Sequence, residues 1–389
     1  GLPIFLVIMA LVFFLTFTVG DWLKGYFETG LDLLTGAVSA GLEAAGTSPM
    51  LNSLLVDGII SGVGGILTFL PNIFILFLAL AFLEDSGYMS RVAFVMDDIM
   101  SHLGLSGRAF LPMLLGFGCT VPAVMASRAL EHKKDRFKTI LVTPFMSCSA
   151  RLTIYVLFSS MFFGKYAMIA CYSIYLIGIV IAILTAYILS RIDGSKAEHA
   201  LLIELPEYKS PNARTIALYV WEKVKDYLTK AGTVIFLASV IMWVLLNFGP
   251  TGYVTNIGES FGSIVGKAIV PLFKPIGLGY WQIVVALIAG IAQKEVVVSS
   301  CSVLFGIQNI TTAHGMNSFV SLLGEMGFGA ANAYALMIFC LLYVPCTATI
   351  ATIRREVGST KLTAGIVLFQ LAVAWVASFI AFHIAGLIL

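Results

Sequence analysis

Three of the six cysteines lie within a few residues of a proline in otherwise apolar sequence: Cys119, Cys148 and Cys346. A thiol beside backbone that proline or glycine has freed from helical hydrogen bonding can bind a soft or borderline metal cation. A cysteine in apolar sequence more often packs as a small hydrophobic residue, and we expect this of Cys171, Cys301 and Cys340. The helix breakers beside the first three favour a role as metal ligands.

Four further side chains are candidate secondary ligands: Met125, Ser147, Thr347 and Glu295. Thioether, hydroxyl and carboxylate groups can join thiols in a mixed site, although methionine usually fills gaps in apolar packing. Glu295 lies in an apolar segment, where an ionisable group is energetically expensive and is a functional candidate for that reason. We expect Glu295 to be buried and paired, with either Lys294 or Arg151.

The elements that position these groups are predicted to be membrane-spanning helices. The chain has 389 residues, of which 59% are hydrophobic and only 11% charged, so it is too apolar to cover the surface of a soluble protein. Continuous apolar runs of about 20 residues predict about seven spanning helices rather than the alternating strands of a barrel. These runs cover residues 2–20, 62–83, 139–163, 166–190, 230–248, 332–353 and 362–388. We therefore predict an all-α polytopic membrane protein.

Lysine and arginine are concentrated in three segments between these runs. Residues 128–138, 191–229 and 354–361 are predicted to be cytoplasmic by this bias, and residues 21–50 and 307–331 to be external. With these sides fixed, the apolar segments 108–128 and 281–306 must each return to the side from which they entered. Each contains a breaker, at 116–122 and 290–295, so both are predicted to be re-entrant or broken hairpins.

The two halves of the chain resemble each other weakly. The sequence Cys148-Ser-Ala in the first half corresponds to Cys346-Thr-Ala in the second, each after a predicted broken segment. This predicts two gate-type pseudo-repeats, at 62–190 and 230–389. They would follow a first helix with an external segment at 1–61, and a cytoplasmic linker with an amphipathic helix at 191–229 would separate them.

Several classes of protein are disfavoured by missing motifs. The sequence contains neither a phosphate-binding P-loop nor the paired histidines of a zinc protease. We predict that the chain is not an enzyme, because a membrane-embedded hydrolase would need a nucleophile with a base in reach. A scaffold or receptor would not need two broken segments, and nothing predicts a nucleic-acid partner. Transport of a small polar solute or ion is favoured.

Two long motifs resemble the gate region of the ferrous-iron transport protein B family. They are Gly116-Phe-Gly-Cys119-Thr-Val-Pro-Ala-Val-Met-Ala-Ser-Arg128 and Pro144-Phe-Met-Ser-Cys148-Ser-Ala-Arg151. Supporting matches are Glu84-Asp-Ser-Gly-Tyr-Met89, Met96-Asp97, Gly104-Leu-Ser-Gly107, Glu204-Leu-Pro206 with Tyr208, Gln293-Lys-Glu295 and Val344-Pro-Cys346-Thr-Ala-Thr349. The resemblance runs nearly end to end. One departure is Asp98, where the resemblance leads us to expect a basic residue.

The resemblance implies an Fe²⁺ importer of the bacterial inner membrane with two gate regions. It implies an N-terminal GTP-binding domain, which this chain lacks and which we expect to lie upstream of its first helix. Fe²⁺ would be the transported substrate, and no permanently bound cofactor is expected. The implied partners are the lipid bilayer, the missing GTP-binding domain, small cytoplasmic Feo accessory proteins and further copies of the chain in a homo-oligomer.

Two alternatives remain open from the residues alone. A carrier of nucleosides or other organic solutes with the same gate architecture would use Asn, Gln, Glu and aromatic residues at both breakers, whereas the breaker at 116–122 offers Cys and Thr. A carrier of another divalent metal is the second alternative. The affinity order of divalent metals does not favour iron, so selectivity would depend on geometry and supply.

Overall fold

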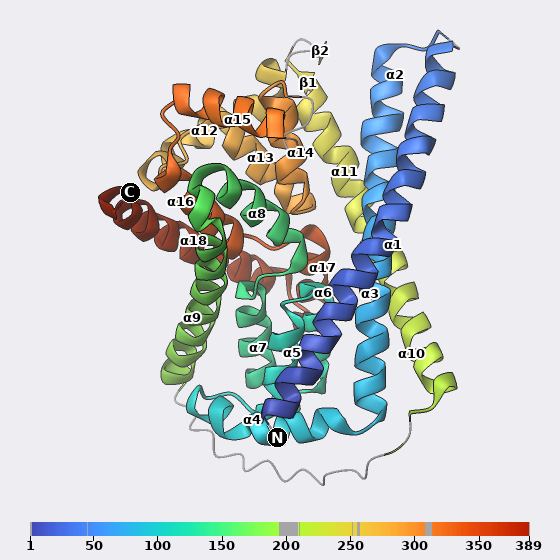
Figure 1. Cartoon of the computed structure of the whole chain (residues 1–389), viewed down its shortest axis with the longest axis vertical. Coiled ribbons are helices and arrows are strands. Elements are labelled where there is room, and N and C mark those ends of the chain that lie inside the picture. The colour runs from blue at the N-terminus through green and yellow to red at the C-terminus, as the bar shows by residue number, and fades with distance from the viewer. Residues whose placement is uncertain are drawn as a thin grey trace. The chain divides into compact units, whose positions relative to one another are not determined.

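The computed structural model of the chain describes residues 2–44, 46–193, 209, 211–250, 252–254, 257–307 and 313–388 (Figure 1). These residues are almost entirely helical. The strands among them are β1 (Phe248–Gly249) and β2 (Gly252–Tyr253), which pair antiparallel. The chain forms two compact units, Gly1–Ile140 with Thr185–Trp243 and Leu141–Leu184 with Val244–Leu389. The predicted all-α class is confirmed, while the predicted repeat and linker boundaries stay a prediction.

The first unit begins with a long apolar helix pair. Its elements are α1 (Leu2–Ala44), α2 (Pro49–Ser53), the π-helix η1 (Leu54–Ile60), α3 (Ser61–Asp85), α4 (Tyr88–His102), η2 (Gly107–Ala109), α5 (Phe110–Leu115), α6 (Thr120–Ala126), η3 (Ser127–Ala129) and most of α7 (Lys133–Val142). Further along the chain it gains α10 (Ala213–Asp226), the π-helix η6 (Tyr227–Ala231) and most of α11 (Gly232–Asn247). Helix α3 packs along α1 on one side and against α10 on another (Figure 1).

A sharp bend separates α3 from α4. The two helices meet at 85°, and Gly87 between them has a φ of 74°, a left-handed conformation that glycine adopts without steric cost. After α4 the chain turns back, and the Asp97 carboxylate accepts a hydrogen bond of 2.8 Å from the backbone N–H of Gly107. A Cβ on Gly107 would lie 2.2 Å from the Ala93 carbonyl oxygen, so this close return needs glycine. Two short motifs of the sequence, Met96-Asp97 and Gly104–Gly107, are thereby joined.

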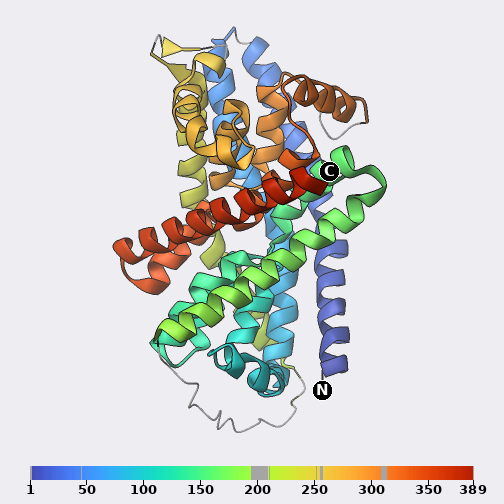
Figure 2. The same cartoon turned by 90° about the vertical axis from the view of Figure 1, so that its left-hand side faces the viewer.

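The second unit is built around one buried helix. Its elements are η4 (Thr143–Phe145), α8 (Ser149–Phe163), η5 (Gly164–Tyr166), most of α9 (Ala167–Asp193), η7 (Ile257–Glu259), α12 (Phe261–Phe273), η8 (Lys274–Ile276), α13 (Trp281–Ala292), α14 (Val296–Leu304), α15 (Ala313–Glu325), α16 (Ala330–Leu342), α17 (Thr347–Val357) and α18 (Thr360–Ile388). Every side chain of α16 from Ala335 to Leu342 is buried. Helix α16 packs along α18 and against α8, which makes it the core of this unit. Helix α18 is the long red helix that ends at the C-terminus in Figure 2.

Large apolar side chains on several helices point outward. Ile169 and Leu176 of α9 are 66% and 63% exposed, and Leu368 of α18 is 65% exposed. Lipid is the environment in which such surfaces are stable. Four stretches of helix among the described residues are long and apolar enough to cross a bilayer, or up to six if each bent pair counts as one span. The chain is therefore a multi-pass membrane protein.

Several predicted spans agree closely with the structure. The runs 62–83, 166–190, 230–248 and 362–388 correspond to α3, α9, α11 and α18. Both segments predicted to be broken are broken, into α5 and α6 in the first case and into α13 and α14 in the second. The linker predicted at 191–229 contains the helix α10, whereas the motif at Glu204, Pro206 and Tyr208 lies outside the described residues.

Three predicted spans need correction. The first helix does not end near residue 20 but continues as α1 to Ala44, because helix formation does not require that the sequence stay apolar. The run 139–163 is interrupted between α7 and α8, and the run 332–353 between α16 and α17. Pro144 and Pro345 lie in these interruptions, where proline lacks the N–H that a continuous helix needs.

Candidate functional site

Each of the three predicted cysteines lies at the N-cap of a helix that restarts after a break. Cys119 precedes α6, Cys148 precedes α8 and Cys346 precedes α17. All three have extended backbone conformations, with φ and ψ of −149° and 130°, −80° and 161°, and −61° and 155° respectively. The three thiols are half-buried, as is that of Cys171, whereas Cys301 and Cys340 are buried. The breaks therefore present thiols beside backbone that is not part of a helix.

The second unit contains two broken helices that meet at their breaks. Gln293–Glu295 separate α13 from α14, and Tyr343–Cys346 separate α16 from α17. The Thr347 hydroxyl, at the start of α17, donates a hydrogen bond of 3.3 Å to the carbonyl of Ala292, at the end of α13. The two broken helices are thus joined where both backbones leave the helical conformation.

A second contact crosses the same point. The amino group of Lys294 donates a hydrogen bond to the Val344 carbonyl and lies 3.3 Å from the centre of the Tyr343 ring. Gly290 leaves room for the Val297 and Tyr343 side chains beside it. A Cβ at this position would lie 2.3 Å from a methyl group of Val297 and 2.5 Å from the Tyr343 hydroxyl. The crossing is therefore held by both a side-chain hydroxyl and a side-chain amino group.

The break before α8 is held by a buried arginine. The Arg151 guanidinium donates to the carbonyl oxygens of Pro144 at 2.9 Å and Met146 at 3.3 Å. Arg151 is only 1% exposed, so its charge is compensated by these carbonyls rather than by water. Cys148 therefore lies at a break that a buried positive charge holds, and Cys346 lies two residues after Val344, whose carbonyl accepts from Lys294. In the second unit, each of these two cysteines thus lies close in sequence to a backbone carbonyl that a buried basic side chain satisfies.

The predicted ligands divide between the two units. Cys119 and the half-buried Met125 belong to the first unit. The second unit contains Cys148, Ser147, Cys346, Thr347 and Glu295. Ser147 is buried, and Glu295 is half-buried at the break between α13 and α14. Within the part of the chain that the structure describes, no three His, Cys, Asp or Glu side chains gather closely enough to hold a metal ion together.

Sequence reasoning missed two members of this region. The Cys346 thiol lies 3.2 Å from the Thr349 hydroxyl, a hydrogen bond within the first turn of α17. Tyr343 places its ring against Lys294. The i, i+3 spacing of Cys346 and Thr349 could have indicated the first contact. The second depends on the crossing of two helices, which the sequence does not report.

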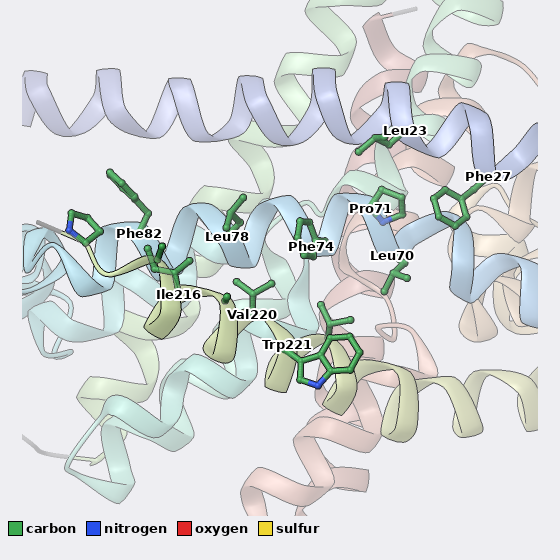
Figure 3. A pocket seen from close by; sticks show the side chains of 14 residues that line it. Leu23, Phe27, Leu70, Pro71, Phe74, Leu78, Phe82, Ile216, Val220 and Trp221 are labelled. Atoms are coloured by element: carbon green, nitrogen blue, oxygen red, sulfur yellow. The ribbon is translucent and has the colours of Figure 1, made fainter.

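A groove in the first unit is separate from these groups. It has a volume of about 810 Å³ and lies between α1, α3 and α10 (Figure 3). Its lining is apolar, with side chains such as Leu23, Phe74 and Trp221, and it includes none of the predicted ligands. Because it offers no thiol, hydroxyl or carboxylate, this groove is not a metal site.

Two models of known protein families match this chain, and the matched residues of one of them include the breaks described above. The family model described as "Gate: Nucleoside recognition" matches residues 66–162 and 228–360, and that of the "Ferrous iron transport protein B C terminus" matches residues 171–223. The protein named Fe(2+) transporter FeoB from Staphylococcus aureus strain MSSA476 is 42% identical over 100% of this chain and 57% of its own length. The chain belongs to the ferrous iron transport protein B family. In this FeoB family member, each of the two gate matches contains two of the breaks described above.

Other FeoB relatives show the same partial coverage. The protein of the same name from Campylobacter jejuni is 38% identical over 100% of this chain and 64% of its own length. That from Methanocaldococcus jannaschii is 39% identical over 93% of this chain and 54% of its own length. The chain thus spans somewhat more than half the length of these curated relatives. No solved structure matches it.

Proposed function

We propose that this chain is the membrane-embedded permease of a ferrous iron importer. One observation carries the proposal: two broken helices cross in the second unit, and Cys346 is the N-cap of the helix that restarts there. Non-helical backbone at membrane depth is tolerated where it lines a cavity, and broken helices mark the binding sites of many transporters. Relatives named Fe(2+) transporter support iron as the cargo.

The chemistry of the breaks suits a borderline cation. Fe²⁺ accepts sulfur and oxygen ligands, and the breaks offer the thiols of Cys148 and Cys346 beside the hydroxyls of Ser147 and Thr347. A thiolate formed on metal binding at Cys148 or Cys346 would lie at the N-terminus of α8 or α17, where the helix dipole favours negative charge. Ligands spread over successive weak sites allow an ion to leave as well as enter. We propose Cys119, Met125 and Glu295 as further ligands along this path.

The whole protein is proposed to contain a GTP-binding domain ahead of this chain. Curated relatives are longer than the chain, and the relative from Porphyromonas gingivalis is named as a fusion of Fe(2+) transport protein A with Fe(2+) transporter FeoB. A small Feo accessory protein is accordingly proposed as a partner. The expected location is the bacterial inner membrane, and assembly into a homo-oligomer is part of the proposal.

The proposal is tested by flux into sealed vesicles. The chain is reconstituted alone and together with its proposed GTP-binding domain, and uptake of Fe²⁺, Mn²⁺, Zn²⁺ and a radiolabelled nucleoside is measured under reducing conditions. We expect Fe²⁺ uptake above that of protein-free vesicles and no nucleoside uptake. Uptake of nucleoside without metal uptake would instead favour the organic-solute carrier that the gate model's description suggests.

A further inference from the structure

Two backbone carbonyls occupy corresponding positions at the breaks of the second unit. Met146 lies two residues before Cys148, and Val344 lies two residues before Cys346. Each belongs to the non-helical backbone between a helix end and the helix that the cysteine caps. Neither carbonyl can therefore be satisfied as it would be inside a continuous helix.

A buried basic side chain donates to each of these carbonyls. Arg151 donates to Met146 at 3.3 Å, and Lys294 donates to Val344. The two side chains are only 1% and 3% exposed. They reach their acceptors differently: Arg151 lies five residues from Met146, whereas Lys294 comes from the other broken helix. The same chemical solution thus occurs twice, once locally and once across the crossing.

The Lys294 amino group contacts two groups that attract a cation. It is bounded by the Val344 carbonyl oxygen and by the face of the Tyr343 ring, 3.3 Å from its centre. A carbonyl oxygen and an aromatic face both present negative potential to a cation. In many transporters, carbonyls at unwound segments hold a monovalent coupling ion.

We propose that Lys294 is a tethered cation that takes the place of a bound monovalent ion at the crossing of the two broken helices. The crossing is then complete without Na⁺ or K⁺, and Lys294 acts as a positioning residue for the start of α17 with Cys346 and Thr347. The positioning role in metal transport rests on the proposed function. The filling of a cation position by the chain itself does not.

Removal of the side chain opens this position to ions from solution. In a Lys294→Ala variant, the Val344 carbonyl and the Tyr343 ring would border a space that Na⁺, K⁺ or ethylammonium can enter and choline cannot. Thermal unfolding of purified protein in detergent is measured in the chloride salt of each cation. We expect a lower Tm than wild type in choline and a recovery of roughly 2–4 °C in at least one of the other three salts, because a ligand that binds only the folded state stabilises it. Wild-type Tm should not depend on the salt.

Lys267→Ala is the matched control. Lys267 donates to the Gly258 carbonyl at 3.0 Å and lies 5.3 Å from the centre of the Trp281 ring. Its amino group thus also contacts one backbone carbonyl and one aromatic ring, but it is exposed. Water can replace its amino group there, so no cation-specific recovery of Tm is expected.

Two further variants decide the matter if Lys294→Ala does not fold. Lys294→Arg keeps the positive charge, and Lys294→Met fills the space without it. We expect Arg to retain both Tm and Fe²⁺ uptake, and Met to lose several-fold in uptake. The inference is overturned if Met matches wild type, if Arg is as impaired as Met, or if folded Lys294→Ala has one Tm in all four salts. If the Tm of Lys294→Ala recovers with a cation but the wild-type protein does not transport Fe²⁺, this inference stands and the proposed function is rejected.

Discussion

The hydroxyl of Thr347 donates a hydrogen bond of 3.3 Å to the carbonyl oxygen of Ala292. Thr347 is the first residue of α17 and Ala292 the last of α13, so the bond joins the ends of two broken helices. Helix ends leave backbone carbonyls without partners in their own helix, and a buried carbonyl without a partner is costly. The crossing of the two breaks therefore satisfies backbone groups that each break leaves open.

Replacement of Thr347 with Val should weaken this crossing. The variant keeps the shape of the side chain but leaves the Ala292 carbonyl without its donor, at a cost of about 1–3 kcal/mol. We expect a lower Tm and reduced Fe²⁺ uptake. Thr352→Val is the control, because the Thr352 hydroxyl donates to Ala348 at 2.8 Å within one helix. Equal effects of the two substitutions would show that the crossing has no special role.

Addition of a single methyl group at Gly290 should disturb the same region from the other side. A Cβ there would lie 2.3 Å from a methyl group of Val297 and 2.5 Å from the Tyr343 hydroxyl, so both must move. Overpacking of this kind costs about 1–3 kcal/mol. Thermal unfolding of Gly290→Ala should show the loss, whereas Gly365→Ala in α18, with no atom within 4 Å of the new Cβ, should be neutral or slightly stabilising. A Gly290→Ala variant as stable as wild type would contradict the packing described here.

The bond between Asp97 and Gly107 gives a prediction for the first unit. Asp97→Ala removes the acceptor of the buried Gly107 N–H, which is bonded at 2.8 Å, and should destabilise by about 1–3 kcal/mol. Asp97→Asn keeps a side-chain oxygen and should recover most of the stability. The neighbouring Asp98 is exposed, and Asp98→Ala serves as the control. If Asn is no better than Ala at position 97, the carboxylate acts in some other way.

Much of the helical framework could be predicted because the bilayer imposes a length on apolar sequence. The run 362–388 corresponds to α18, Thr360–Ile388, and the run 62–83 to α3, Ser61–Asp85. The runs 139–163 and 332–353 were predicted as single spans although each contains a helix breaker, Pro144 or Pro345, because hydrophobicity reports burial in lipid and not continuity of the backbone.

The candidate site was predictable only in part. Proximity to breakers selected Cys148 and Cys346, and both lie at helix N-caps. Lys294 was named only as a possible partner of Glu295. Its contact with the Val344 carbonyl could not be predicted, because a backbone carbonyl has no signature in the sequence. The pairing predicted for Glu295 and the role of the ligands remain predictions.

The orientation of the chain in the membrane also remains a prediction. The excess of Lys and Arg places residue 133 in the cytoplasm and residues 48 and 325 outside. Single cysteines at these positions, in a chain whose native cysteines are replaced, can be labelled with a reagent that does not cross the membrane. We expect labelling from outside at 48 and 325 only. External labelling at 133 would reverse the scheme.

If iron moves past thiols at the helix breaks, a variant that lacks all three of these thiols should lose Fe²⁺ uptake. Cys119→Ser, Cys148→Ser and Cys346→Ser are combined in one protein and compared with Cys171→Ser, which alters a half-buried cysteine of α9 away from any break. Both proteins should fold and insert, with matching Tm values. We expect the triple variant to lose Fe²⁺ uptake by roughly 10-fold or more, the size of loss that weakened metal ligation causes. Cys171→Ser should transport at the wild-type rate. Uptake at the wild-type rate by the triple variant would contradict thiol ligation of the transported ion.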